Sequence, residues 1–138
     1  MMHLTSRYLI SLASFIVLTS MAVAKTNPAC LKHLGGGYGD AECYHGLSAD
    51  ITADNDKLYR NLRATIPLGN AHQKLLNDYM ASQNDAIKYC ELQRNAGAQW
   101  KAEHDGSMFP ALYEQCVYNI RKTQSTFLQD LLKMANWK

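Results

Sequence analysis

Cysteine is the residue type whose number and spacing point most clearly to chemistry in this chain. The sequence contains four cysteines, Cys30, Cys43, Cys90 and Cys116, and all of them follow an apolar N-terminal stretch. An even number of cysteines in a small exported protein usually forms disulfides, because the compartment is oxidising and a small core benefits from covalent links. Free thiols or a zinc site are less favoured, since the sequence has no closely spaced Cys-x-x-Cys pair.

Residues 1–24 have the pattern of a cleaved signal peptide. Arg7 precedes a nearly apolar run from Tyr8 to Val23, and Ala22-Val23-Ala24 is the small-x-small pattern at which signal peptidase cleaves. The run is too short and too rich in serine and threonine for a permanent anchor, which needs about 20 apolar residues. We therefore expect a periplasmic or secreted protein with no membrane anchor after cleavage.

Residues 25–138 are expected to form one domain of ordinary size. The whole chain has 14 Lys and Arg against 12 Asp and Glu, and removal of Arg7 brings the mature part close to neutrality. Nucleic acids and anionic membranes select clustered basic residues. The sequence shows no basic stripe, so we expect no nucleic-acid partner.

Apolar residues at spacings of three and four predict an all-α fold. The three expected helices cover residues 40–64, 70–101 and 110–135, and short connections between them favour a small antiparallel three-helix bundle. Asp40 is placed to cap the first helix, and Pro110 suits the first turn of the third. The apolar stripes comprise Leu47, Ile51, Leu58 and Leu62, then Leu75, Leu76, Tyr79, Met80, Gln83, Ile87, Cys90 and Leu92, and finally Leu112, Cys116, Ile120, Phe127, Leu131 and Met134.

These helices allow a prediction of the disulfide pairing. Cys90 and Cys116 lie at similar heights on two helices joined by a short connection, which favours a Cys90–Cys116 disulfide. Cys30 and Cys43 would then pair with each other and link the glycine-rich N-terminal segment to the first helix. The other two pairings remain open. Each disulfide should contribute about 3 kcal/mol by constraining the unfolded chain.

The segment from Asp105 to Cys116 resembles the Gly-Ser, short gap, Tyr-x-x-Cys segment of the lysozyme inhibitor LprI-like family. The order of the four cysteines follows that family over nearly the whole mature chain, although the arginine of the family's last helix aligns near Gln124. The resemblance implies a small exported helical protein that binds and inhibits lysozyme or another peptidoglycan-cleaving enzyme. It also implies that the protein is not itself an enzyme and needs no cofactor.

An inhibitor of lysozyme must present donors to the two carboxylates of the enzyme cleft. Two loops are candidates. In the first, His104 and Ser107 supply donors, while Met108 and Phe109 supply apolar contacts. The alternative is that Gly106-Ser107 caps the third helix and that Phe109 packs into the core.

The second candidate loop is residues 34–39, in which three successive glycines precede Tyr38. Glycine exposes backbone amides to a partner, and tyrosine is a common interface anchor. The alternative interpretation is a plain flexible linker.

Other combinations of reactive residues point less clearly to a function. His104, Asp105 and Ser107 are the residue types of a hydrolytic triad, but neighbours within one turn do not align for catalysis. His33 and His45 flank the first disulfide, yet surface histidines more often bind no metal, so no metal is expected. Two other functions remain open: an immunity protein that neutralises a delivered toxin, and an envelope structural or stress protein without an enzyme partner.

Overall fold

The computed structural model describes residues 24–101 and 106–137, and within them every regular element is a helix. The all-α prediction is therefore confirmed for the described residues, whereas residues 1–23 of the expected signal peptide lie outside them. None of the described helices is both long and apolar enough to cross a membrane. The elements are η1 (Pro28–Lys32), α1 (Tyr38–Thr65), α2 (Ala71–Ala86), η2 (Ile87–Tyr89), α3 (Cys90–Gly97) and α4 (Met108–Ala135).

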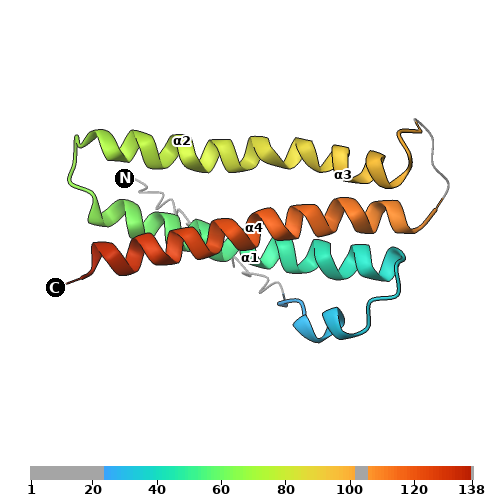
Figure 1. Cartoon of the computed structure of the whole chain (residues 1–138). Coiled ribbons are helices and arrows are strands. Elements are labelled where there is room, and N and C mark those ends of the chain that lie inside the picture. The colour runs from blue at the N-terminus through green and yellow to red at the C-terminus, as the bar shows by residue number, and fades with distance from the viewer. Residues whose placement is uncertain (1–23, 102–105, 138) are drawn as a thin grey trace, which may run out of the picture.

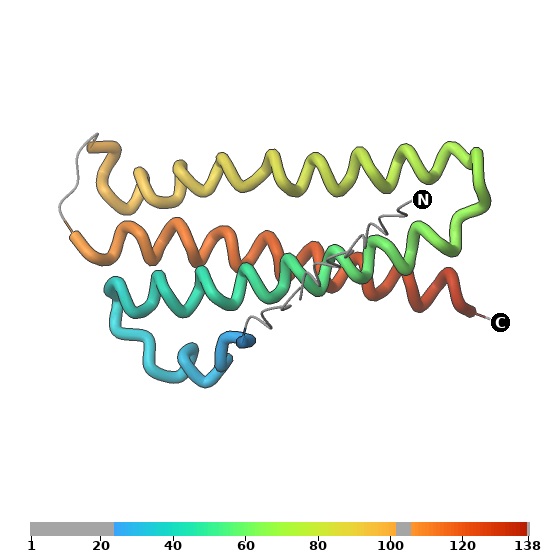
Figure 2. The backbone as a smooth tube through the Cα atoms, turned by 180° about the vertical axis from the view of Figure 1, so that it is seen from behind, coloured from blue at the N-terminus to red at the C-terminus, as the bar shows by residue number. Residues whose placement is uncertain are grey.

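The helices form three rods that lie side by side (Figures 1 and 2). α1 and α4 run in the same direction, and α2, η2 and α3 together form a third rod that runs the opposite way. α1 and α4 have 28 residues each, so each is about 42 Å long. The start of α1, the end of α3 and the start of α4 share one end of the molecule, here called the loop end. The α1–α2 connection and the end of α4 lie at the other, the turn end.

The starts of the first two long helices show how local sequence sets their boundaries. The Asn70 side chain accepts a hydrogen bond from the His72 amide at 2.9 Å and caps α2, where the sequence predicted a helix to begin. α1 begins earlier than expected, because Gly37 occupies the N-cap position. Asp40 therefore lies within the first turn of α1, and the prediction that it caps the helix is wrong.

The second expected helix is interrupted, which corrects the prediction of one continuous helix over residues 70–101. The short 3₁₀ turn η2 separates α2 from α3, and α3 ends at Gly97. A Cβ at Gly97 would collide with the Leu112 side chain, so glycine permits the close approach of α4. Gln99 and Trp100 then adopt positive φ angles of 54° and 62°, which a right-handed helix does not allow.

Both disulfides have the predicted pairing. Cys30 is bonded to Cys43 and joins η1 to α1, with a Cα–Cα distance of 5.9 Å. Cys90 is bonded to Cys116 and joins α3 to α4, with a Cα–Cα distance of 5.5 Å. Cys90 is fully buried, so this second link lies inside the packed structure, between the rods.

Toward the turn end, one buried leucine from each rod forms a leucine core, Leu62, Leu76 and Leu128. Leu128 is fully buried, whereas its neighbour Phe127 is 44% exposed. The predicted apolar stripe of the last helix included Phe127 and omitted Leu128, so it was wrong by one residue. The cause is that polar side chains occupy part of the buried face of α4 and hide its periodicity.

Those polar side chains form a buried network between α1 and α4. Asn55 Nδ2 donates to the Arg121 carbonyl and to Gln124 Oε1, both at 3.1 Å. Arg121 Nη1 donates to the same Gln124 oxygen at 3.0 Å. Burial lowers the pKa of Arg121, and the negative charge of Asp56 partly opposes that shift. The network pairs the Asn55 amide nitrogen, the Arg121 guanidinium and the Gln124 oxygen, while Asn55 Oδ1 has no hydrogen-bond partner among the described residues. Its bonds favour one register of α1 against α4.

Replacement of Gln124 tests the importance of this network. In Gln124→Leu the buried donors of Asn55 and Arg121 lose their shared acceptor, so the free energy of unfolding should fall by about 2–3 kcal/mol. Urea unfolding followed by circular dichroism measures the loss. Gln129 is an exposed glutamine of the same helix, so Gln129→Leu is the matched control and should change stability by less than about 0.5 kcal/mol. Equal losses in the two variants would show that the network contributes nothing.

Candidate functional site

The two loops that the sequence singled out meet at the loop end. A Cβ built on Gly37 would lie 3.4 Å from Ser107 Oγ, so the N-cap residues of α1 and α4 lie close together. The Gly37 end of one loop and the Ser107 end of the other therefore share one surface. Tyr38 and Met108 stand on it with 65% and 46% of their area exposed.

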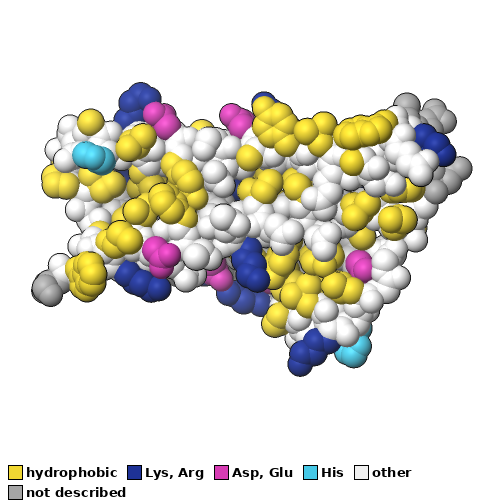
Figure 3. Space-filling model, viewed as in Figure 1, with side chains coloured by type: hydrophobic (Ala, Val, Ile, Leu, Met, Phe, Trp, Pro, Cys, Tyr) yellow, Lys and Arg dark blue, Asp and Glu magenta, His cyan; other side chains and the backbone are white. Residues whose placement is uncertain are grey.

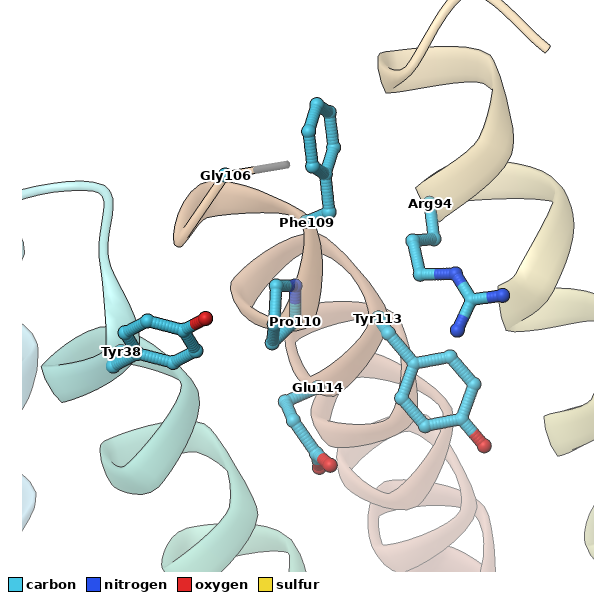
Figure 4. Close-up of a pocket in the computed structure, with 7 residues that line it drawn as sticks. All are labelled: Tyr38, Arg94, Gly106, Phe109, Pro110, Tyr113 and Glu114. Atoms are coloured by element: carbon cyan, nitrogen blue, oxygen red, sulfur yellow. The ribbon is translucent and has the colours of Figure 1, made fainter. Parts of the chain in front are cut away.

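A pocket of about 340 Å³ opens on this surface between three helices. Figure 4 shows Tyr38 reaching from α1 toward Pro110, while Arg94 extends from α3 toward Tyr113. Two of the predicted binding residues, Tyr38 and Phe109, thus line one pocket. The complete lining is Tyr38, Arg94, Gly106, Phe109, Pro110, Tyr113 and Glu114.

The other three predicted binding residues are Ser107, Met108 and His104, and the first two do not line the pocket. Ser107 is exposed at the N-cap position of α4, and its side chain makes no capping hydrogen bond there. The alternative in which Gly106-Ser107 forms the N-cap of this helix is therefore confirmed for the position of Ser107, without a side-chain bond. Met108 is exposed beside the pocket without lining it. His104 lies outside the described residues.

The burial of Phe109 lies between that of an exposed binding residue and that of a core residue, the two roles considered for it. It is half-buried, and a Cβ at Gly106 would lie 2.9 Å from Phe109 Cε2. The ring thus packs against the backbone of Gly106 instead of entering the leucine core. This packing requires glycine at position 106, and the ring still lines the pocket.

Asp40 orders the glycine-rich loop that carries Tyr38. Its two carboxylate oxygens accept hydrogen bonds from the Gly35 amide at 2.9 Å and the Gly36 amide at 2.6 Å. Gly36 has a φ of 83°, a conformation that favours glycine. The carboxylate also lies in the first turn of α1, where the helix dipole stabilises a negative charge. The loop is therefore held in one conformation, and the plain-linker interpretation does not describe it.

Several contacts below the pocket join the helices that form it. His45 Nδ1 and Glu114 Oε2 are 3.3 Å apart and connect α1 with α4. Gln115 Nε2 donates to the Tyr44 hydroxyl at 3.2 Å across the same pair of helices. Gln93 Nε2 donates to the Leu112 carbonyl at 3.2 Å and connects α3 with α4, as the Cys90–Cys116 disulfide also does. These contacts therefore hold α1, α3 and α4 together beneath the pocket.

Sequence reasoning missed Arg94, Glu114 and Trp100 as parts of this end of the molecule. Arg94 forms an ion pair with Glu91 one turn earlier, which is an ordinary surface pattern that does not indicate a site. Glu114 follows Pro110 by four residues, so helical spacing could have placed it on the same face as that pocket residue. Trp100 is 68% exposed just after α3, and its position depends on the backbone turn that ends that helix.

The structure offers no metal site among the residues that it describes, since no three His, Cys, Asp or Glu side chains cluster there. His45 contacts Glu114. The triad residue types at positions 104 and 105 lie outside the described chain, so their relation to Ser107 stays untested.

Comparisons with known proteins identify no relative of this chain. Neither protein-family models, nor curated proteins, nor solved structures give a match. The resemblance to the LprI-like family therefore still rests on the cysteine order and the peptide around Ser107.

Asp40→Ala tests whether the carboxylate holds the glycine loop. Loss of its two hydrogen bonds should release the Gly35 and Gly36 amides and lower stability by about 0.5–1.5 kcal/mol. Amide hydrogen exchange measured by NMR should then become faster at both glycines while protection within α4 persists. Glu42→Gln, at an exposed carboxylate two residues further along α1, is the control. Unchanged exchange in Asp40→Ala would contradict the ordering role.

Proposed function

We propose that this protein is exported, folds as a disulfide-linked antiparallel three-helix bundle, and inhibits a peptidoglycan-cleaving enzyme of the lysozyme type through its loop end. The pocket that Tyr38 and Phe109 line together is the observation that carries the proposal. It joins the two predicted binding loops into one surface, which is what an inhibitor needs to enter a cleft. The LprI-like resemblance supplies the class of partner.

The exposed side chains at the loop end have the chemistry of a protein interface. Tyr38, Trp100 and Met108 expose 65%, 68% and 46% of their area, and the helix ends that carry them share one end of the molecule (Figure 1). Tyrosine, tryptophan and methionine are enriched at interfaces, and tyrosine and tryptophan are frequent hot-spot residues. This combination favours a protein partner.

Donors at the same end suit a cleft that contains carboxylates. The Ser107 hydroxyl is exposed and makes no capping hydrogen bond, and the Tyr38 hydroxyl is carried on a largely exposed ring. Arg94 contributes a guanidinium that is shared with Glu91. The near-neutral charge of the mature chain offers little long-range attraction to a basic enzyme, so short-range complementarity would supply the affinity.

The two disulfides support the proposed export to an oxidising compartment and the proposed binding through a preordered surface. Disulfides persist in oxidising compartments such as the periplasm and the exterior of the cell. They also link η1 to α1 and α3 to α4, so the surface is ordered before a partner binds. Preorganisation of this kind lowers the entropy cost of association.

Inhibition of cell-wall clearing tests the proposed function. Oxidised protein spanning residues 25–138 should slow, in proportion to its concentration, the clearing of a cell-wall suspension by at least one type of lysozyme. Reduction of the disulfides should abolish the effect, because the loop end loses its bracing. Absence of inhibition with every type of lysozyme would refute the proposal.

Single substitutions then locate the contact surface. Tyr38→Ala should weaken inhibition about tenfold or more, as expected for an exposed aromatic anchor. Tyr89 is 59% exposed and does not line the pocket, so Tyr89→Ala is the matched control and should inhibit like the unmodified protein. Ser107→Ala combined with Phe109→Ala should also weaken inhibition while the circular dichroism spectrum stays helical. A loss of helicity in that double variant would instead show that Phe109 serves the packing of α4.

A further inference from the structure

Two concave surfaces of the molecule differ in chemistry. At the turn end, an open apolar groove of about 720 Å³ lies between the end of α1, the first part of α2 and the end of α4. Hydrophobic side chains gather over this part of α2 and α4 in Figure 3. Asp78 is the one acid among the described lining residues of this groove, and it is paired with Lys74. The pocket at the loop end instead combines aromatic rings with the carboxylate of Glu114.

The Glu114 carboxylate is largely withdrawn from water, and no described lysine or arginine forms an ion pair with it. Its side chain is 21% exposed, and its partner is His45, whose Nδ1 lies 3.3 Å from Glu114 Oε2. The other carboxylate oxygen, Oε1, makes no hydrogen bond to the residues that the structure describes. Histidine is mostly neutral at pH 7. The contact with His45 therefore leaves most of the negative charge of Glu114 uncancelled.

Arg94 is the one cation among the described lining residues, and its guanidinium already has partners. Its Nη2 forms an ion pair with Glu91 Oε2, and its Nε donates to Asn95 Oδ1 at 3.4 Å. Both partners lie with Arg94 on α3, and neither lines the pocket. The charge of Arg94 is thus compensated by an acid of its own helix. Glu114 carries the uncompensated charge of the pocket.

Aromatic side chains line the same pocket as this carboxylate. Figure 4 shows Tyr38 reaching in from α1, whereas Phe109 and Tyr113 are carried, like Glu114, by α4. Aromatic ring faces attract cations, and the attraction is stronger where the cation is partly removed from water. A carboxylate with an open oxygen strengthens this preference, because charge-assisted hydrogen bonds are stronger than neutral ones. The pocket therefore favours an organic cation.

We propose that the loop-end pocket receives a lysine or arginine side chain of the inhibited enzyme, whose ammonium or guanidinium group pairs with the Glu114 carboxylate. This inference rests on the proposed function, because it names the group by which the enzyme is recognised. A basic lysozyme offers such side chains. The near-neutral mature chain attracts a basic enzyme little at long range, whereas a carboxylate in a pocket provides charge complementarity at the contact itself.

NMR titration of oxidised residues 25–138 with Nα-acetyl-lysine methylamide tests the pocket without any enzyme. We expect saturable shifts of the amide signals of Tyr113 and Glu114. Nα-acetyl-norleucine methylamide lacks only the ammonium group and should bind about fivefold more weakly or worse. Nα-acetyl-arginine methylamide is the second cationic probe, and saturable binding of either cation supports the proposal. Equal binding of the lysine and norleucine probes, or no binding of either cation, would overturn it.

Three variants connect this binding to the carboxylate. Glu114→Gln removes the charge but can still accept a hydrogen bond from His45, so it should bind the lysine probe about fivefold more weakly or worse. His45→Ala removes the contact and keeps the carboxylate, so it should bind the probe as well as the unmodified protein does. Glu42→Gln, at an exposed carboxylate of α1 that does not line the pocket, is the matched control. Equal losses in Glu114→Gln and His45→Ala would show that the contact matters instead of the charge, which overturns the proposal.

Inhibition assays separate this inference from the proposed function. Against a lysozyme that the unmodified protein inhibits, Glu114→Gln should need about fivefold more protein for equal inhibition, and Glu42→Gln should need the same amount. Full inhibition by Glu114→Gln would overturn the cation site and leave the proposed function standing. If no lysozyme is inhibited, the proposed function fails, whereas saturable binding of the lysine probe would still establish a site for a cationic side chain.

Discussion

The packing of α1 along α4 is the constraint on which the rest of the structure depends. These two helices are the longest in the chain, and they run side by side for most of their length (Figures 1 and 2). At their centre lies a polar network of Asn55, Arg121 and Gln124, of which Asn55 and Gln124 are almost inaccessible to solvent. A shift of one helix against the other would leave these buried groups without partners, at a cost that apolar packing alone would not impose. The network therefore sets the register of the two helices, and the register sets which residues meet at each end.

The two halves of the third rod, α2 and α3, are attached to α1 and α4 by different kinds of contact. α3 is bonded to α4 through Cys90–Cys116 and approaches it closely at Gly97. α2 contacts the pair mainly through Leu76, Tyr79 and Met80, around the leucine core. The break at η2 separates these halves. One end of the molecule is consequently braced by covalent and polar links, whereas the other keeps an open apolar groove.

This difference gives the two ends different chemical capacities. The loop end combines exposed aromatic and hydroxyl groups with the paired side chains of His45 and Glu114 at its base, a combination that suits the proposed protein interface. The turn end exposes aliphatic and aromatic side chains around a concave surface. One small helical domain can present both because its rods are about 42 Å long, so the two surfaces do not share residues.

The sequence by itself determined the all-helical fold and the approximate positions of the helices, and it favoured the cysteine pairing that the structure shows. These features follow from local properties: apolar spacing, the Asn70 cap, and the similar heights of Cys90 and Cys116 on neighbouring helices. It also named Tyr38, Ser107 and Phe109 as candidates. It mistook the buried face of the last helix, because Arg121 and Gln124 lie where an apolar pattern was expected, and it missed the break at η2.

Only the tertiary structure decided that Gly37 lies close to Ser107, that Arg94 and Glu114 complete the pocket, and that a groove remains open at the other end. Each of these depends on how far one helix is rotated and shifted against another. Helix periodicity is a property of one segment, whereas rotation and register result from the packing of two segments that are distant in sequence.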